Sequence, residues 1–170
     1  KTEYNQLTRL EVRDDDMVNV LILYYSRGGH TDALAKAIAS GVEKIESAKA
    51  VLKRVDYATG IELIECDAVA FGSPNYFGYM AGIMKDYFDR TVGNRGKVEG
   101  RPAVAFSSGS GESTGALDSL EKMIDSFKLR KIADGLVFSG EPSDDDLAKC
   151  VEMGSKLAKE AAERSSEPQE

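Results

Sequence analysis

Residues 20–31 read V-L-I-L-Y-Y-S-R-G-G-H-T, and this stretch decides the fold. It continues an apolar run that starts at Val18, of the kind that forms a buried parallel strand, and then turns through small residues. A helical pattern starts directly afterwards, at Asp32, and extends to about Ile45. A buried strand that leads through a glycine turn into a helix is the repeating unit of parallel α/β proteins.

The turn between this strand and this helix has the composition of a phosphate site. Backbone N–H groups at a helix N-terminus point toward an anion, and the helix dipole adds a partial positive charge. The two glycines allow the backbone to approach such an anion closely, and the hydroxyl groups at both ends of the turn can donate hydrogen bonds. The side chains of Arg27 and His30 either contact the phosphate or lie in solvent. The expected phosphate site consists of Ser26, Arg27, Gly28, Gly29, His30 and Thr31.

Strand and helix patterns alternate along the rest of the chain. Four more strand patterns follow, at residues 50–55, 68–72, 102–107 and 135–139. Helical patterns separate or follow them, at residues 80–91, 115–127 and 143–162. This alternation predicts an α/β, doubly wound, three-layer sandwich with a five-stranded parallel sheet.

Three of the strands lead into loops of unusual composition. The third is followed by S-P-N-Y-F-G-Y-M, residues 73–80, and the fourth by S-S-G-S-G-E-S-T-G, residues 107–115. If the strand order is 2-1-3-4-5, these loops and the turn at 26–31 share one rim of the sheet. Together they would suit a flat, phosphorylated aromatic ligand. Each loop alone also has a simpler interpretation, as a tight turn, a buried aromatic cluster or a plain surface loop.

Composition narrows the class of protein. The 170 residues suffice for one domain with a sizeable core, and the net charge of −7 argues against nucleic acid and anionic membranes as partners. No apolar run approaches the roughly 20 residues that a membrane-spanning helix needs. Cys66 and Cys150 are far apart, which favours a reduced, cytoplasmic protein and leaves one disulfide as an alternative. With a single histidine, the two cysteines also argue against a metal site.

Both ends of the chain differ from its middle. Residues 1–16 are polar and end in the acidic run D-D-D, so we expect an N-terminal extension that is disordered or added to the natural chain, with Met17 as the natural start. The domain then occupies residues 17–164, and residues 165–170 form a disordered tail.

Two other families of similar layout fit the motifs less well. A phospho-acceptor receiver domain needs an acidic pair after the first strand and an aspartate after the third, where this chain has residues 26–27 (S-R) and 73–74 (S-P). A faint dinucleotide fingerprint at residues 109–115 follows the wrong strand and has the wrong spacing.

From Val18 to its last helix, the chain resembles the flavodoxin-like superfamily. It is most similar to short flavodoxins and to the related FMN-dependent NAD(P)H:quinone oxidoreductases. The turn at 26–31 resembles their FMN phosphate loop. Residues 72–90, G-S-P-N-Y-F-G-Y-M-A-G-I-M-K-D-Y-F-D-R, resemble the segment that holds the isoalloxazine ring, and residues 105–111, A-F-S-S-G-S-G, resemble the loop on its other side.

This resemblance implies FMN as the cofactor and the strand order 2-1-3-4-5. The phosphate would lie at residues 26–31. The ring would be held by Pro74, Asn75, Tyr76, Phe77 and Gly78, and the pocket closed by Ser107, Ser108, Gly109, Ser110 and Gly111. No side chain is expected to act as a catalytic acid or nucleophile, because the flavin carries the chemistry.

Two functions are compatible with this resemblance. The chain could carry electrons between redox partner proteins, as a monomer or homodimer, or it could reduce quinones with NAD(P)H. Its small size and acidity favour the carrier. Two departures from classical flavodoxins matter: Gly28 replaces a hydroxyl residue of their T/S-x-T-G-x-T loop, and the chain has no tryptophan. A non-redox module that has lost its flavin is a third, less favoured reading.

Overall fold

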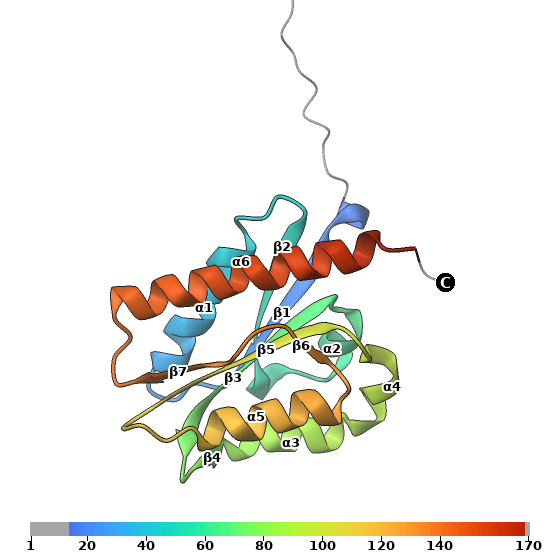
Figure 1. The fold of residues 1–170 in the computed structure, drawn as a ribbon. Coiled ribbons are helices and arrows are strands. Elements are labelled where there is room, and N and C mark those ends of the chain that lie inside the picture. Colours follow the sequence, from blue (N-terminus) through green and yellow to red (C-terminus); the bar gives the residue numbers. More distant parts are fainter. Residues whose placement is uncertain (1–13, 169–170) are drawn as a thin grey trace, which may run out of the picture.

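A parallel sheet forms the middle layer, as the alternating pattern predicts. The structure is a computed structural model that describes residues 14–168 (Figure 1). Its five main strands are β1 (Val18–Tyr24), β2 (Ala48–Arg54), β3 (Ala68–Tyr76), β5 (Pro102–Gly109) and β7 (Leu136–Ser139). They lie in the order β2-β1-β3-β5-β7 with neighbouring strands parallel, which confirms the predicted order 2-1-3-4-5.

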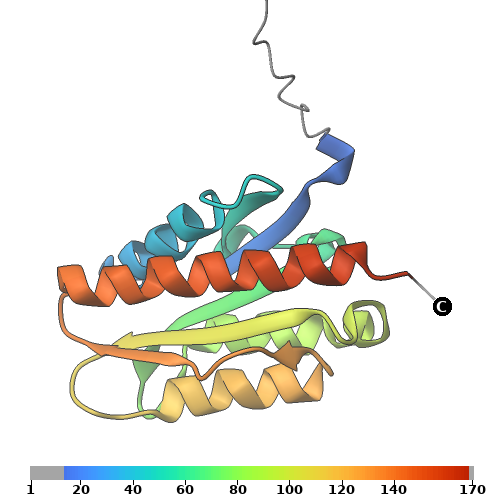
Figure 2. The ribbon, with the colours of Figure 1, turned by 45° about the horizontal axis from the view of Figure 1, so that its top comes forward.

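Helices cover both faces of this sheet (Figures 1 and 2). One face carries α1 (His30–Val42) and α6 (Asp144–Ser166), and the other carries α3 (Gly82–Arg90) and α5 (Gly115–Ser126). Short elements complete the connections: η2 (Val55–Tyr57), α2 (Ile61–Glu65), η3 (Val92–Asn94) and α4 (Arg95–Val98). None of the described helices is long and apolar enough to cross a membrane.

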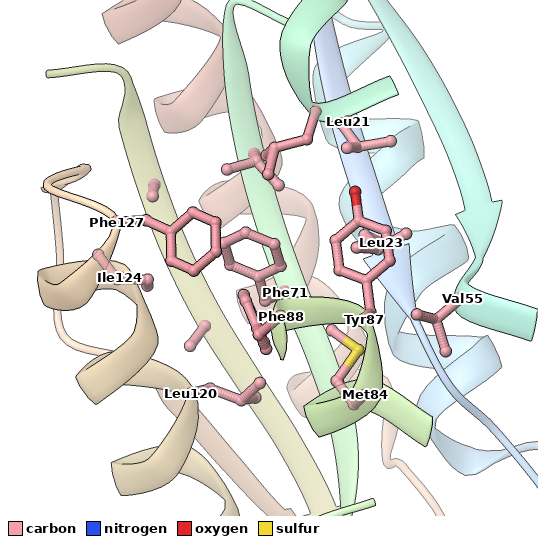
Figure 3. Close-up of a cluster of buried hydrophobic side chains, with 14 of the residues drawn as sticks. Leu21, Leu23, Val55, Phe71, Met84, Tyr87, Phe88, Leu120, Ile124 and Phe127 are labelled. Atoms are coloured by element: carbon pink, nitrogen blue, oxygen red, sulfur yellow. The ribbon is translucent and has the colours of Figure 1, made fainter. Parts of the chain in front are cut away.

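The continuous apolar run of β1 follows from burial on two sides. Successive side chains of a strand point to opposite faces. Leu21 and Leu23 belong to the cluster beneath α3 and α5, drawn in Figure 3 with Tyr87 of α3 beside them. Val20 and Ile22 pack on the other face, beneath α1 and α6. Because both faces are covered, the strand needs apolar residues at consecutive positions rather than at every second one.

Two short strands have no counterpart in the sequence pattern: β4 (Tyr79–Met80) and β6 (Arg130–Lys131). Because β4 pairs antiparallel with the end of β3, the helix expected from residue 80 begins only at Gly82. The main strands β3 and β5 also continue past the ends expected at residues 72 and 107. Backbone pairing between them persists to Pro74 and Ser108, and it does not require apolar side chains.

The chain ends differ in part from the expected boundaries. Residues 1–13 of the expected extension and 169–170 of the expected tail lie outside the described residues. Residues 14–16 form a single 3-10 turn, η1 (Asp14–Asp16), directly before β1. Helix α6 ends at Ser166, two residues beyond the domain boundary expected at 164. It stops there because Pro168 disfavours helical geometry at the residue before it.

Two glycines bring α1 and α6 into close contact. A Cβ atom added at Gly154 would lie 2.0 Å from the carbonyl oxygen of Ile38, and one added at Gly41 would lie 1.9 Å from that of Val151. The hydroxyl of Ser155 also donates a hydrogen bond of 2.9 Å to the carbonyl of Gly41. The helix that starts at the glycine turn is therefore fixed against the last helix of the chain by direct backbone contact.

We expect Gly154→Ala to lower the free energy of unfolding by about 1–3 kcal/mol, although alanine favours a helix more than glycine does. The added methyl group cannot be accommodated unless α1 and α6 move apart. Urea unfolding measures the change. The control is Gly96→Ala in α4, where an added Cβ meets no atom within 4 Å, so stability should not fall. A Gly154→Ala protein as stable as wild type would contradict the close contact.

Candidate functional site

Three loops meet at the carboxyl edge of the sheet, where they surround a hollow of about 290 Å³. We call it the rim hollow. It is lined by Ser26, Arg27, Gly28, His30, Thr31, Pro74, Asn75, Tyr76, Ser108, Gly109 and Ser110. All of these residues are among the site residues expected from the sequence. The remaining expected residues do not line it: Gly29, Phe77, Gly78, Ser107 and Gly111.

The turn after β1 leaves the start of α1 open. Gly29 is the N-cap residue of the helix, with φ of 97°, and no side chain caps the helix there. An added Cβ at Gly28 or Gly29 would meet no atom within 4 Å, so the backbone is accessible. The first N–H groups of a helix have no partner within the helix. This helix start can therefore receive an anion.

Helix α6 starts in the opposite way. The hydroxyl of Ser143 accepts a hydrogen bond from the backbone N–H of Asp146, and the Asp146 carboxylate accepts one from the N–H of Ser143. Three aspartates, residues 144–146, occupy its first turn. The N-terminus of α6 is thus already capped and negatively charged, in contrast to that of α1.

Two hydroxyl groups connect the glycine turn with the end of β5. The oxygens of Thr31 and Ser108 are 2.7 Å apart, and both residues are buried. Ser107, the neighbour of Ser108, points to the other face of the sheet. Its buried hydroxyl has no hydrogen-bond partner among the described residues. Ser107 therefore lies beneath the rim rather than in the hollow.

The aromatic residues after β3 form the tip of a hairpin, not part of the core. Tyr76 and Tyr79 pair across it, and Phe77 and Gly78 make the turn with φ of 53° and 74°. Positive φ at both turn residues is the geometry of a tight hairpin turn. Phe77 is fully exposed, while Tyr76 is 36% exposed and lines the hollow. Burial of this aromatic cluster in the core, the simpler interpretation, is wrong.

Hydrogen bonds to three polar side chains hold this hairpin in place, and two of these residues, Ser73 and Ser119, are not among the site residues expected from the sequence. The hydroxyl of Ser119, on α5, accepts a hydrogen bond of 3.1 Å from the N–H of Met80. The hydroxyl of Ser73 accepts one of 2.8 Å from the N–H of Ala81. The side-chain oxygen of Asn75 accepts one of 2.9 Å from the first turn of α5. Nothing in the sequence distinguishes Ser119 from a surface serine.

Two more residues beside the hollow were not expected. The ring of Tyr25 meets that of Tyr76 edge-on, with centroids 6.5 Å apart. The guanidinium of Arg54 donates a hydrogen bond of 2.9 Å to the carbonyl of Ser26. The strand order indicates that Arg54 lies near the site, because it places this last residue of β2 next to the end of β1.

One carboxylate lies in the first turn of α1, and its charge is compensated. Asp32 accepts hydrogen bonds of 2.5 Å from the hydroxyl of Tyr24 and of 2.7 Å from the amine of Lys36. Burial acts to raise the pKa of Asp32, but these two partners lower it below its ordinary value. Burial and the hydrogen bond to Asp32 raise the pKa of Tyr24 from 10.0 to about 12. Asp32 thus stays ionised while paired at the helix start.

Comparison with known proteins identifies close relatives in sequence. A family model described as Flavodoxin matches residues 22–154. A flavodoxin from Aquifex aeolicus is 31% identical over 159 residues, covering 84% of this chain and 86% of that protein. The residues matched by the family model include the glycine turn, the hairpin and the end of β5.

Solved structures share the fold at lower identity. A flavodoxin from the domain Archaea has a TM-score of 0.78 at 23% identity, covering 85% of this chain and 99% of its own. A WrbA-like protein from Agrobacterium tumefaciens has a TM-score of 0.75 at 23% identity, with coverage of 86% and 98%. The rubredoxin oxygen:oxidoreductase from Desulfovibrio gigas has a TM-score of 0.80 at 16% identity; the match covers 90% of this chain but 39% of that larger one.

The Tyr24 pKa predicts a pH dependence of stability. The folded chain releases this phenolic proton at about 12, whereas an unfolded chain releases it at its ordinary value of 10.0. The stabilisation is therefore complete below pH 10 and is lost as the pH rises toward 12. Between pH 9 and 11 we expect wild type to lose about 1.4 kcal/mol more stability than Tyr24→Phe, measured by urea unfolding. A constant difference between the two proteins would contradict the raised pKa.

Proposed function

The chain belongs to the flavodoxin family, whose members bind FMN, and we propose that the rim hollow holds this cofactor and that the chain carries electrons between redox partner proteins. One observation carries the proposal. An uncapped helix start with two accessible glycines and an aromatic hairpin lie on the same rim of the sheet. Separately, either feature has a structural explanation. Together they match the two ends of a phosphorylated aromatic cofactor.

The glycine turn is suited to the phosphate group. Backbone N–H groups of the turn and the positive end of α1 favour a dianion there, although the N–H of Gly29 donates to the hydroxyl of Ser26 in this structure. Gly28, which replaces a hydroxyl residue of classical flavodoxins, removes one side-chain donor. Arg27 and His30 both line the hollow and can supply contacts in its place. The donor set is therefore compatible with a phosphate monoester.

The hairpin and the end of β5 are suited to the ring. Tyr76 and Pro74 contribute apolar surface to the hollow, and residues 108–110 contribute polar groups to it. Bound FMN would supply the one- and two-electron chemistry, and the chain would hold the ring, exclude water from it and present it to a partner. Ser73 and Ser119, which fix the hairpin, would keep the ring position constant.

We expect Gly29→Asp to weaken FMN binding at least about a hundredfold, because it places a carboxylate and a strained backbone in the phosphate turn. Quenching of FMN fluorescence on addition of apoprotein measures the dissociation constant. The matched control is Gly100→Asp, whose glycine also has positive φ, 79°, and open space around it, but precedes β5 and so lies at the opposite end of that strand from the rim. Unchanged affinity in Gly29→Asp would remove the turn from the site.

A second candidate, an NAD(P)H-dependent quinone reductase, is favoured by the sequence of residues 72–90 alone. The visible spectrum of the FMN-loaded protein under anaerobic conditions separates the two. For a carrier, we expect NADPH and NADH to leave the flavin bands intact over minutes, while dithionite bleaches them. Rapid bleaching by either nucleotide would overturn the carrier in favour of the reductase.

A further inference from the structure

Arg54, the last residue of the edge strand β2, clamps the turn after β1. One guanidinium nitrogen donates a hydrogen bond of 2.9 Å to the carbonyl of Ser26, and another donates one of 3.1 Å to the carboxylate of Asp56. The guanidinium carbon lies 6.0 Å and 5.7 Å from the ring centroids of Tyr24 and Tyr25. The side chain is therefore held in place by a carboxylate and two aromatic rings while it binds the turn.

The clamp acts on one peptide unit. Peptide bonds are trans throughout the described residues, so the N–H of Arg27 points away from the carbonyl of Ser26. Ser26 and Arg27 both line the rim hollow, whereas Arg54 does not. The guanidinium thus binds the carbonyl of this peptide from a residue that does not line the hollow, and the N–H of Arg27 lies on the opposite side of the same peptide unit.

The glycine turn has one internal hydrogen bond, which the N–H of Gly29 donates to the hydroxyl of Ser26 at 3.1 Å, and it is also supported from outside at both ends. Gly28 and Gly29 have little conformational preference of their own, and no side-chain hydrogen bond caps the helix start that follows. The far end of the turn is fixed by the hydroxyl contact between Thr31 and Ser108. Arg54 fixes the near end, from a neighbouring strand.

We propose that Arg54 is a positioning residue that orients the peptide between Ser26 and Arg27 for a phosphate group, so that it contributes to binding of the phosphate and not of the flavin ring. This inference rests on the proposed function of the rim hollow. Asp56 compensates the charge of Arg54, so the effect comes mainly from geometry. A lysine could reach the carbonyl but could not bind Asp56 with a second nitrogen, and it lacks the planar guanidinium that lies near the two rings.

The test compares FMN with riboflavin, which has the same ring and no phosphate, by fluorescence quenching with wild type, Arg54→Gln and Arg54→Lys. We expect Arg54→Gln to lower the affinity for FMN about tenfold and to leave that for riboflavin unchanged. Arg54→Lys should restore part of the preference for FMN. An equal loss for both ligands, or an unchanged ratio of the two affinities, would overturn the role of Arg54.

Arg90 provides a matched control. Its guanidinium also binds one carbonyl, that of Ala58 at 3.0 Å, and one carboxylate, that of Asp86 at 3.0 Å, and lies 5.0 Å from the ring of Tyr87. Arg90→Gln should therefore leave the ratio of affinities at the wild-type value. A wild-type chain with no preference for FMN over riboflavin would instead refute the phosphate site itself, and the role of Arg54 with it.

Discussion

Parallel pairing of β1, β3 and β5 is the constraint on which the rest of the structure depends. Parallel neighbours place their carboxyl ends on one edge, and the register here aligns Tyr24 with Gly72 and Pro74 with Ser108. The glycine turn, the hairpin and the polar end of β5 are distant in sequence and still meet. Burial of the sheet on both faces holds this arrangement in place, because no strand can slide without exposing one of two apolar clusters.

The rim is shaped by residues that line the hollow and by others that hold those residues from outside. Ser119 and Ser73 bind the hairpin backbone, and Arg54 binds the glycine turn. Each of these side chains forms a hydrogen bond with a backbone N–H or carbonyl group that lies outside the five main strands. Such groups cost free energy when buried without a partner, so the supports also allow the loops to stay irregular at the edge of a close-packed core.

The sequence pattern predicts the layers and the three loops of unusual composition, because apolar runs and glycine turns are local signals. The strand order that brings these loops together is implied by the family resemblance, since no local signal determines it. The pattern does not predict how far β3 and β5 extend, since their last residues pair through the backbone alone. The strand β4 has only two residues, too few to give a strand pattern. The contacts of Ser119 and Arg54 depend on neighbours distant in the chain, so no local pattern indicates them. The cofactor contacts expected for all of the site residues stay predictions, and five of these residues do not line the hollow: Gly29, Phe77, Gly78, Ser107 and Gly111.

The hairpin tip shows that folding alone does not explain every residue of this chain. Phe77 has left-handed backbone geometry, which costs a bulky residue about 1 kcal/mol relative to glycine, and its exposed ring gains little from burial. A glycine or asparagine would adopt this backbone geometry at a lower cost and would not expose a large apolar ring. Position 77 therefore represents a trade-off, in which a large apolar group is kept in solvent at the expense of thermodynamic stability.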